Sequence, residues 1–221
     1  MADFLWTRPD QTPTAVLLLA HGAGAAMDSS FMNRLSTALA AHGIAACRFE
    51  FAYMAKRRDG GPKAPPPKAD KLIGEFQTAL QKLLAEMKAE GLDCPVLIGG
   101  KSMGGRVAAM LAGGSSLPSR VKAVACFGYP FHPTGQSDAP WRMEPLEQAN
   151  RPVLILQGER DPFGNQEELS GITLPEKVSI TYLEDGNHDF GPRGQSPATL
   201  DSNVTAAAAA AAEFAAKLAQ A

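Results

Sequence analysis

The stretch Val96-Leu97-Ile98-Gly99-Gly100-Lys101-Ser102-Met103-Gly104-Gly105 decides how the fold of this chain is interpreted. Its first residues form a short apolar run that is typical of a buried strand, and Met103–Ala112 has the apolar spacing of a helix. Ser102 lies in the turn between them, with Gly100 and Gly104 two residues to either side. At the tip of such a strained turn the hydroxyl stands clear of the sheet, and the flanking positions have no room for a Cβ. Because this motif also arises by chance, its surroundings must support the interpretation.

Apolar runs of strand length lie on both sides of this turn. Most lack strict alternation with polar residues, which favours parallel strands covered on both faces. The predicted strands are Ala15–Ala20, Ile44–Phe51, Val96–Gly99, Val121–Gly128, Val153–Gln157 and Val178–Leu183. The helices predicted between and after them are Ser30–His42, Lys71–Glu90, Met103–Ala112 and Ser202–Ala219. This alternation predicts an α/β fold, with a mostly parallel sheet of about six to seven strands and helices on both faces.

Two segments interrupt the alternation, and neither is long enough to be a domain. Residues 56–70 are rich in proline, glycine and lysine, so we expect a loop, and a solvated basic loop is favoured over an anion site. Arg48 and Glu50 are expected to pair with each other or with this loop. Residues 129–151 contain several prolines that prevent a long helix. We therefore expect one domain over residues 1–221, with its core at about 14–219 and no large cap.

Composition excludes several classes of protein. A net charge of −2 provides no field that would attract nucleic acid or an anionic membrane. The three cysteines are odd in number and lack the spacing of metal ligands, which favours a reducing, cytoplasmic setting. No targeting or membrane-spanning segment is expected. We predict no metal and no cofactor, and a homodimer is left open.

A base is needed beside Ser102, because a serine hydroxyl is a poor nucleophile at neutral pH. Four histidines are present: His21, His42, His132 and His188. A lone histidine is most often structural, but His188 directly follows the last predicted strand. The loops that follow parallel strands gather at one edge of the sheet, as does the turn of Ser102. The position of His188 therefore favours it as the general base.

The orienting acid is expected after a strand and before His188 in the chain. Asp161, in Gly158-Glu159-Arg160-Asp161-Pro162, fits this position. Glu159 is the nearest rival, and Asp185 and Asp189 are closer to His188 in sequence. An acid adjacent to the histidine seldom reaches Nδ1 with good geometry. The alternative for Asp161 is a turn-forming role before proline. The chain order Ser102, Asp161, His188 favours the catalytic interpretation.

The exit of the first strand, His21-Gly22-Ala23-Gly24, supplies the remaining element. Acyl chemistry needs N–H donors at the developing oxyanion, and a glycine-rich loop exposes its amides. We expect the backbone N–H groups of Ala23 and Met103 to form this hole, although the glycines also suit a plain turn. His21 is expected to fix the loop and to border the substrate. The other predicted substrate contacts are Tyr129, Phe131 and Trp141.

With these pieces in place, the chain resembles the small, cap-less α/β-hydrolases. The motifs at residues 21–24, 100–105, 158–161 and 186–188 carry the resemblance, which covers nearly the whole chain. Within the superfamily it is similar to dienelactone-hydrolase-like proteins, which commonly use cysteine where this chain has Ser102. Closer still is an α/β-hydrolase-like domain found in bacteria and in a subunit of a histone-acetyltransferase complex. Residues 48–54, the proline-rich loop and residues 128–133 support that closer match, which says little about substrate.

These observations predict a serine hydrolase that cleaves a small carboxylic ester or thioester through an acyl-enzyme. Acyl transfer or perhydrolysis on the same triad is the alternative within the class. A non-catalytic interaction module that retains the fold is the alternative from another class, and the presence of all three of Ser102, Asp161 and His188 argues against it.

Overall fold

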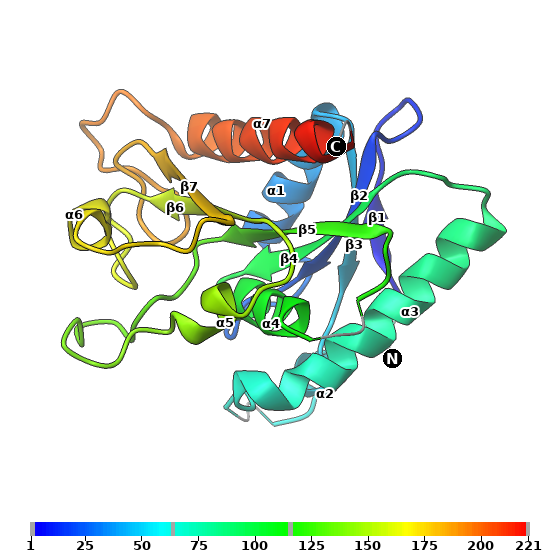
Figure 1. Ribbon diagram of the computed structural model, residues 1–221, viewed down its shortest axis with the longest axis horizontal. Helices are drawn as coiled ribbons and strands as arrows, with labels where there is room; N and C mark the ends of the chain where they lie inside the picture. The colour runs from blue at the N-terminus through cyan, green and yellow to red at the C-terminus, as the bar shows by residue number, and fades with distance from the viewer. Residues whose placement is uncertain (1–2, 63–64, 115–116, 220–221) are drawn as a thin grey trace.

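A seven-stranded sheet with the strand order β1-β3-β2-β4-β5-β6-β7 organises the computed structural model (Figure 1). The structure describes residues 3–62, 65–114 and 117–219. Strands β2 to β7 run parallel, and β1 pairs antiparallel with β3. The strands are β1 (Leu5–Thr7), β2 (Ala15–Ala20), β3 (Ile44–Phe49), β4 (Val96–Lys101), β5 (Val121–Phe127), β6 (Val153–Gly158) and β7 (Val178–Leu183). The predicted α/β class and mostly parallel sheet are confirmed.

Helices cover both faces of this sheet. On one face α1 and α7 pack against each other, while α3 and α4 pack on the opposite face (Figure 1). The helices are α1 (Ser30–Ala41), α2 (Ala52–Arg58), α3 (Ile73–Ala89), α4 (Met103–Ala112), α5 (Glu144–Glu147), α6 (Gln166–Ser170) and α7 (Leu200–Ala219), and a 3₁₀ turn spans Ala69–Leu72. None of the helices in the described parts of the chain combines the length and hydrophobicity needed to cross a bilayer.

The central strand β2 shows why its sequence is apolar throughout. Its side chains alternate between faces, so Val16 and Leu18 join the core beneath α3 and α4, while Leu17 and Leu19 join the core beneath α1 and α7. All four are fully buried. A parallel strand covered on both faces needs apolar residues at every position, which explains the missing alternation.

Three sequence predictions need correction. Strand β3 ends at Phe49 and not at Phe51, and α2 begins at Ala52. Residues 56–58 are therefore helical and residues 69–70 begin the 3₁₀ turn, although a loop was predicted over residues 56–70. Residues 63 and 64 of the predicted loop lie outside the described part of the chain. Strand β1 was missed because three residues provide too little periodicity. Between β5 and β6 the described chain forms only the short helix α5, in agreement with the expected lack of a large cap.

Candidate active site

Ser102 occupies a strained turn between β4 and α4. Its φ is +50°, which L-residues seldom adopt, and its N–H donates to the Phe127 carbonyl at 3.0 Å. A Cβ on Gly100 would lie 2.6 Å from the carbonyl carbon of Gly104, and one on Gly104 would lie 2.6 Å from the His21 carbonyl oxygen. The close packing expected at both glycines is therefore present, and it holds Ser102 at the carboxyl edge of the sheet.

Asp161 and His188 form a direct pair at the same edge. Nδ1 of His188 lies 2.8 Å from Oδ2 of Asp161, whose side chain is 0% exposed. The other carboxylate oxygen accepts the N–H of Phe163 at 2.9 Å, and the Phe163 ring centroid is 4.4 Å from that of His188. A carboxylate held in this way fixes both the tautomer and the orientation of the imidazole. The hydrogen bonds of the described residues do not include one between Ser102 and His188.

The loops that carry Asp161 and His188 are joined by backbone contacts. The N–H of Arg160 donates to the Gly186 carbonyl at 2.8 Å, and the N–H of Glu159 donates to the Leu183 carbonyl at 3.1 Å. A Cβ on Gly158 would lie 2.4 Å from the carbonyl oxygens of both Gly186 and Asn187. Only glycine fits at this crossing, so Gly158 brings the two loops within reach of each other.

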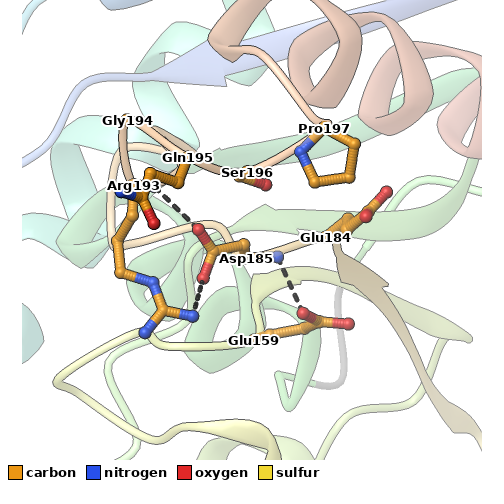
Figure 2. Close-up of a pocket in the computed structure, with 8 residues that line it drawn as sticks. All are labelled: Glu159, Glu184, Asp185, Arg193, Gly194, Gln195, Ser196 and Pro197. Carbon is orange, nitrogen blue, oxygen red and sulfur yellow. Dashed lines mark hydrogen bonds and ion pairs between the residues drawn. The ribbon is translucent and has the colours of Figure 1, made fainter.

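The rival acids are engaged elsewhere. Glu159 accepts the N–H of Asp185 at 2.7 Å, and Asp185 is bound by Arg160 and Arg193. Hydrogen bonds from the Arg193 side chain and N–H lower the pKa of Asp185 to about 2. Glu159, Asp185 and Arg193 line a hollow of about 700 Å³. Figure 2 shows these side chains together. Asp189 pairs with Lys101 at 3.2 Å. Asp161 is thus the acid that contacts His188.

Lys101 connects the nucleophile turn to the histidine loop. It precedes Ser102, and its partner Asp189 follows His188. The Lys101 side chain is 8% exposed, and its ammonium lies 5.4 Å from the centre of the Phe31 ring. Burial lowers the pKa of Lys101, and the neighbouring Asp189 carboxylate partly offsets that effect. This pair was not predicted from the sequence.

The predicted oxyanion donors lie on adjacent segments. A Cβ on Gly22 would lie 3.8 Å from Cβ of Ser102, so the loop that carries Ala23 runs beside the serine. Met103 is the first residue of α4, where N–H groups have no acceptor within the helix. Among the hydrogen bonds of the described residues, neither the N–H of Ala23 nor that of Met103 has a protein acceptor. Both amides are therefore available to a bound oxyanion.

Three of the four predicted substrate contacts are instead fully buried. His21 and Phe131 are 0% exposed, and so is Tyr129, whose hydroxyl donates to the Arg142 carbonyl at 2.8 Å. Trp141 is half-buried, and its ring lies 5.8 Å from that of Phe131. Position after a strand does not reveal where a side chain points. His21, Tyr129 and Phe131 are therefore packed in the interior of the fold.

The side chains that hold the loop after β2 were not recognised as functional from the sequence. Tyr53 donates its hydroxyl to the carbonyls of Gly22 and Ala23, and Glu50 accepts the N–H of Met27 at 3.2 Å. Glu50 also pairs with Arg58 at 2.9 Å, which is one of the two contacts that the sequence predicted for it. Among the described residues, Arg48 pairs with neither Glu50 nor the segment 56–70, and it donates to the Met27 carbonyl at 2.9 Å. The available signal was the density of charged and aromatic residues at 48–58.

The described residues provide no ready metal site. Within the described ranges, no three His, Cys, Asp or Glu side chains gather in a way that would hold a metal ion.

A serine on a strand–turn–helix, with an aspartate–histidine pair on later strands of a parallel sheet, is the arrangement of α/β-hydrolases. The family model for an alpha/beta hydrolase domain matches residues 13–216. The chain belongs to this family.

Solved structures with the same fold are distant in sequence. A dienelactone hydrolase from Anabaena variabilis is 20% identical, with a TM-score of 0.68 over 97% of this chain and 91% of that chain. An α/β serine hydrolase without lid from Xanthomonas campestris is 16% identical, with a TM-score of 0.66 over 96% of this chain and 88% of that one. Est1E from Butyrivibrio proteoclasticus, with ferulic acid bound, is 14% identical, with a TM-score of 0.65 over 99% and 96%.

Proposed function

We propose that this protein is a serine hydrolase acting on small carboxylic esters or thioesters. Oγ of Ser102 attacks the acyl carbon while Nε2 of His188 takes its proton, and the carbonyl π bond opens to an oxyanion. As the tetrahedral adduct collapses, His188 returns the proton to the departing alcohol or thiol. Water, deprotonated by His188, then attacks the acyl carbon, and His188 returns that proton to Oγ of Ser102 as the acyl–serine bond breaks and the carboxylic acid is released. No cofactor enters these steps.

Two backbone donors stabilise the oxyanion in this proposal. They are the N–H groups of Ala23 and Met103, one from each side of Ser102. Loss of a single donor of this kind typically costs about 10²–10³ in kcat. Asp161 keeps the proton of His188 on Nδ1, so that Nε2 is free to accept the proton of Ser102.

The observation that carries the proposal is the hydrogen bond of 2.8 Å between Nδ1 of His188 and the buried carboxylate of Asp161. A purely structural histidine does not need a buried carboxylate at the sheet edge where a strained serine also stands. The absence of a Ser102–His188 hydrogen bond is compatible with this role, because such bonds often tighten only when substrate is bound.

Covalent labelling tests the nucleophile. Intact-mass spectrometry after treatment with a fluorophosphonate should show one adduct, which is lost in Ser102→Ala together with esterase activity. Ser170→Ala, in α6, is the matched control and should label and turn over like the wild type. Labelling or turnover that persists in Ser102→Ala would overturn the proposal.

The size of the acyl group tests the substrate class. Only α5 lies between β5 and β6 in the described chain, so there is little surface to enclose a fatty chain. Each buried methylene would contribute about 0.8 kcal/mol, and an open site stops gaining after the first few carbons. With p-nitrophenyl esters, kcat/KM should peak between acetate and butyrate and fall by octanoate. A steady rise to dodecanoate would contradict the proposed small acyl group.

The same measurements separate the alternatives. An acyltransferase would label at Ser102 but would partition the acyl group to an added alcohol in preference to water, and a perhydrolase would do so with peroxide. A non-catalytic module would neither label nor turn over any ester. A cytoplasmic location is part of the proposal, and it is supported by the free cysteines Cys47, Cys94 and Cys126.

A further inference from the structure

The loop after β2 is anchored almost entirely by one segment of the chain, residues 48–58, which we call the β3–α2 cradle. Met27 in this loop is bound through its N–H by Glu50 and through its carbonyl by Arg48. The carboxylate of Asp28 accepts hydrogen bonds from both terminal nitrogens of Arg58, at 2.7 and 2.9 Å. Arg58 also forms an ion pair with the buried carboxylate of Glu50. Burial opposes ionisation of Glu50, but the hydrogen bonds from Arg58 and Met27 hold its pKa below the ordinary value.

At the start of the same loop, the cradle holds the carbonyl of Gly22. The ring nitrogen Nε2 of His21 accepts the N–H of Phe51 at 3.1 Å, so Nδ1 carries the proton and donates to the Gly22 carbonyl at 2.6 Å. The hydroxyl of Tyr53 donates to the same carbonyl at 3.3 Å and to that of Ala23 at 3.0 Å. Burial raises the pKa of Tyr53 to about 12, so the phenol keeps its proton.

A trans peptide unit links this carbonyl to the proposed oxyanion donor. The C=O of Gly22 and the N–H of Ala23 belong to one planar unit, in which they point in opposite directions. The described chain contains no cis peptide bond. Holding the carbonyl on the side of Tyr53 and His21 therefore directs the Ala23 N–H to the other side of the peptide, and Gly22 itself borders Ser102.

We propose that Tyr53 is a positioning residue, whose hydroxyl acts with the imidazole of His21 to aim the Ala23 N–H at the oxyanion. This inference rests on the proposed function, since it needs an oxyanion to form on a Ser102 adduct. It assigns a role to the aromatic and charged residues at 48–58, which the triad leaves unexplained. Tyr53 touches no reacting atom and acts only through the peptide between Gly22 and Ala23.

The test compares Tyr53→Phe with Tyr182→Phe, which removes a phenol from β7 in the opposite half of the sheet. With p-nitrophenyl acetate, Tyr53→Phe should lower kcat about tenfold with KM changed less than twofold, because a misdirected amide weakens binding of the transition state only. A trifluoromethyl ketone, whose serine adduct carries an oxyanion, should lose affinity by the same factor. Affinity for acetate, the product, should not change. Tyr182→Phe should match the wild type in all four.

Three outcomes overturn the inference. They are an unchanged kcat in Tyr53→Phe, a loss that appears only in KM, and an unchanged affinity for the ketone. Each leaves the proposed function standing as long as Ser102→Ala remains inactive, whereas activity in Ser102→Ala overturns the function itself. If Tyr53→Phe lowers the melting temperature, the ratio of ketone to acetate affinity, measured well below both melting temperatures, still separates a positioning role from a loss of folded protein.

Discussion

The two sides of the candidate site are held in different ways. On one side, the loop after β2 is fixed by side chains that reach from the β3–α2 cradle, among them Glu50, Tyr53 and Arg58. On the other, the side chains of Glu159 and Arg160 also join the loops after β6 and β7, but the two backbones cross in direct contact at Gly158 and Gly186. Side-chain contacts can be removed one at a time, but two crossing backbones have no such freedom. We therefore expect a change at the backbone crossing to disturb the fold more than the loss of any single side-chain contact.

The largest effect is expected at the carboxylate on the backbone-held side. Asp161→Asn should lower kcat on the order of 10⁴-fold, because an amide favours the wrong tautomer of His188. Steady-state kinetics on p-nitrophenyl acetate measure this, with circular dichroism to verify folding. Glu159→Gln is the matched control, since Glu159 bonds to the N–H of Asp185 instead, and it should cost less than tenfold. If the two variants were affected in the reverse order, the assignment of the acid would be wrong.

A methyl group at the loop crossing should have the next largest effect. Gly158→Ala places a Cβ within 2.4 Å of two carbonyl oxygens, so the loops must separate. Overpacking of this kind typically costs about 1–3 kcal/mol, and for a chain of this size each kcal/mol lowers the melting temperature by roughly 2–4 °C. Differential scanning calorimetry and esterase assays should both show the change.

Gly24→Ala provides the control on the side held by side chains. A Cβ there would meet nothing within 4 Å, so stability should remain within about 0.5 kcal/mol of the wild type. Equal melting temperatures for Gly158→Ala and Gly24→Ala would remove the proposed difference between the two sides.

The Lys101–Asp189 pair joins the nucleophile turn to the backbone-held side, and its two partners should not be equivalent. Asp189→Asn leaves a buried ammonium without its carboxylate, whereas Lys101→Met replaces that ammonium with an apolar side chain of similar length. Because Asp189 is 71% exposed, we expect only about 1 kcal/mol of destabilisation from Asp189→Asn and less from Lys101→Met. Urea unfolding of both variants measures this difference, and a more stable Asp189→Asn would contradict it.

The last effect depends on pH and concerns His21, the histidine of the loop after β2. Burial lowers the pKa of His21 in the folded protein, while the unfolded chain titrates near its ordinary value of about 6.5. Below that pH the unfolded state binds the extra proton, so the contribution of neutral His21 to stability is present above about pH 6.5 and is lost as the pH falls. The slope for one group is at most about 1.4 kcal/mol per pH unit.

His21→Asn should therefore flatten the fall in melting temperature between about pH 7 and pH 5. His42→Asn, at the exposed end of α1, is the control and should retain the wild-type profile. If both variants followed the wild-type profile, protonation of His21 would not be coupled to unfolding.

The sequence by itself determined the fold class and the edge of the sheet at which the chemistry gathers. Continuous apolar runs such as Ala15–Ala20 predict strands buried on both faces, and Gly100 and Gly104 predict the turn that displays Ser102. These are local signals, because periodicity and the space around a backbone atom are set by residues close in the chain. The same logic placed Asp161 and His188 at strand ends, where parallel strands bring their loops together.

Only the tertiary structure decided which side chains meet. The sequence left four acids in competition, and the choice depends on Gly158 crossing Gly186 and on Glu159, Asp185 and Asp189 having other partners. The sequence also predicted that Tyr129 and Phe131 contact the substrate, but both side chains are fully buried in the structure. The role of Tyr53 emerges only when α2 packs beside the loop after β2. Side-chain direction and contacts between distant segments depend on the packing of the whole chain, which no local pattern encodes.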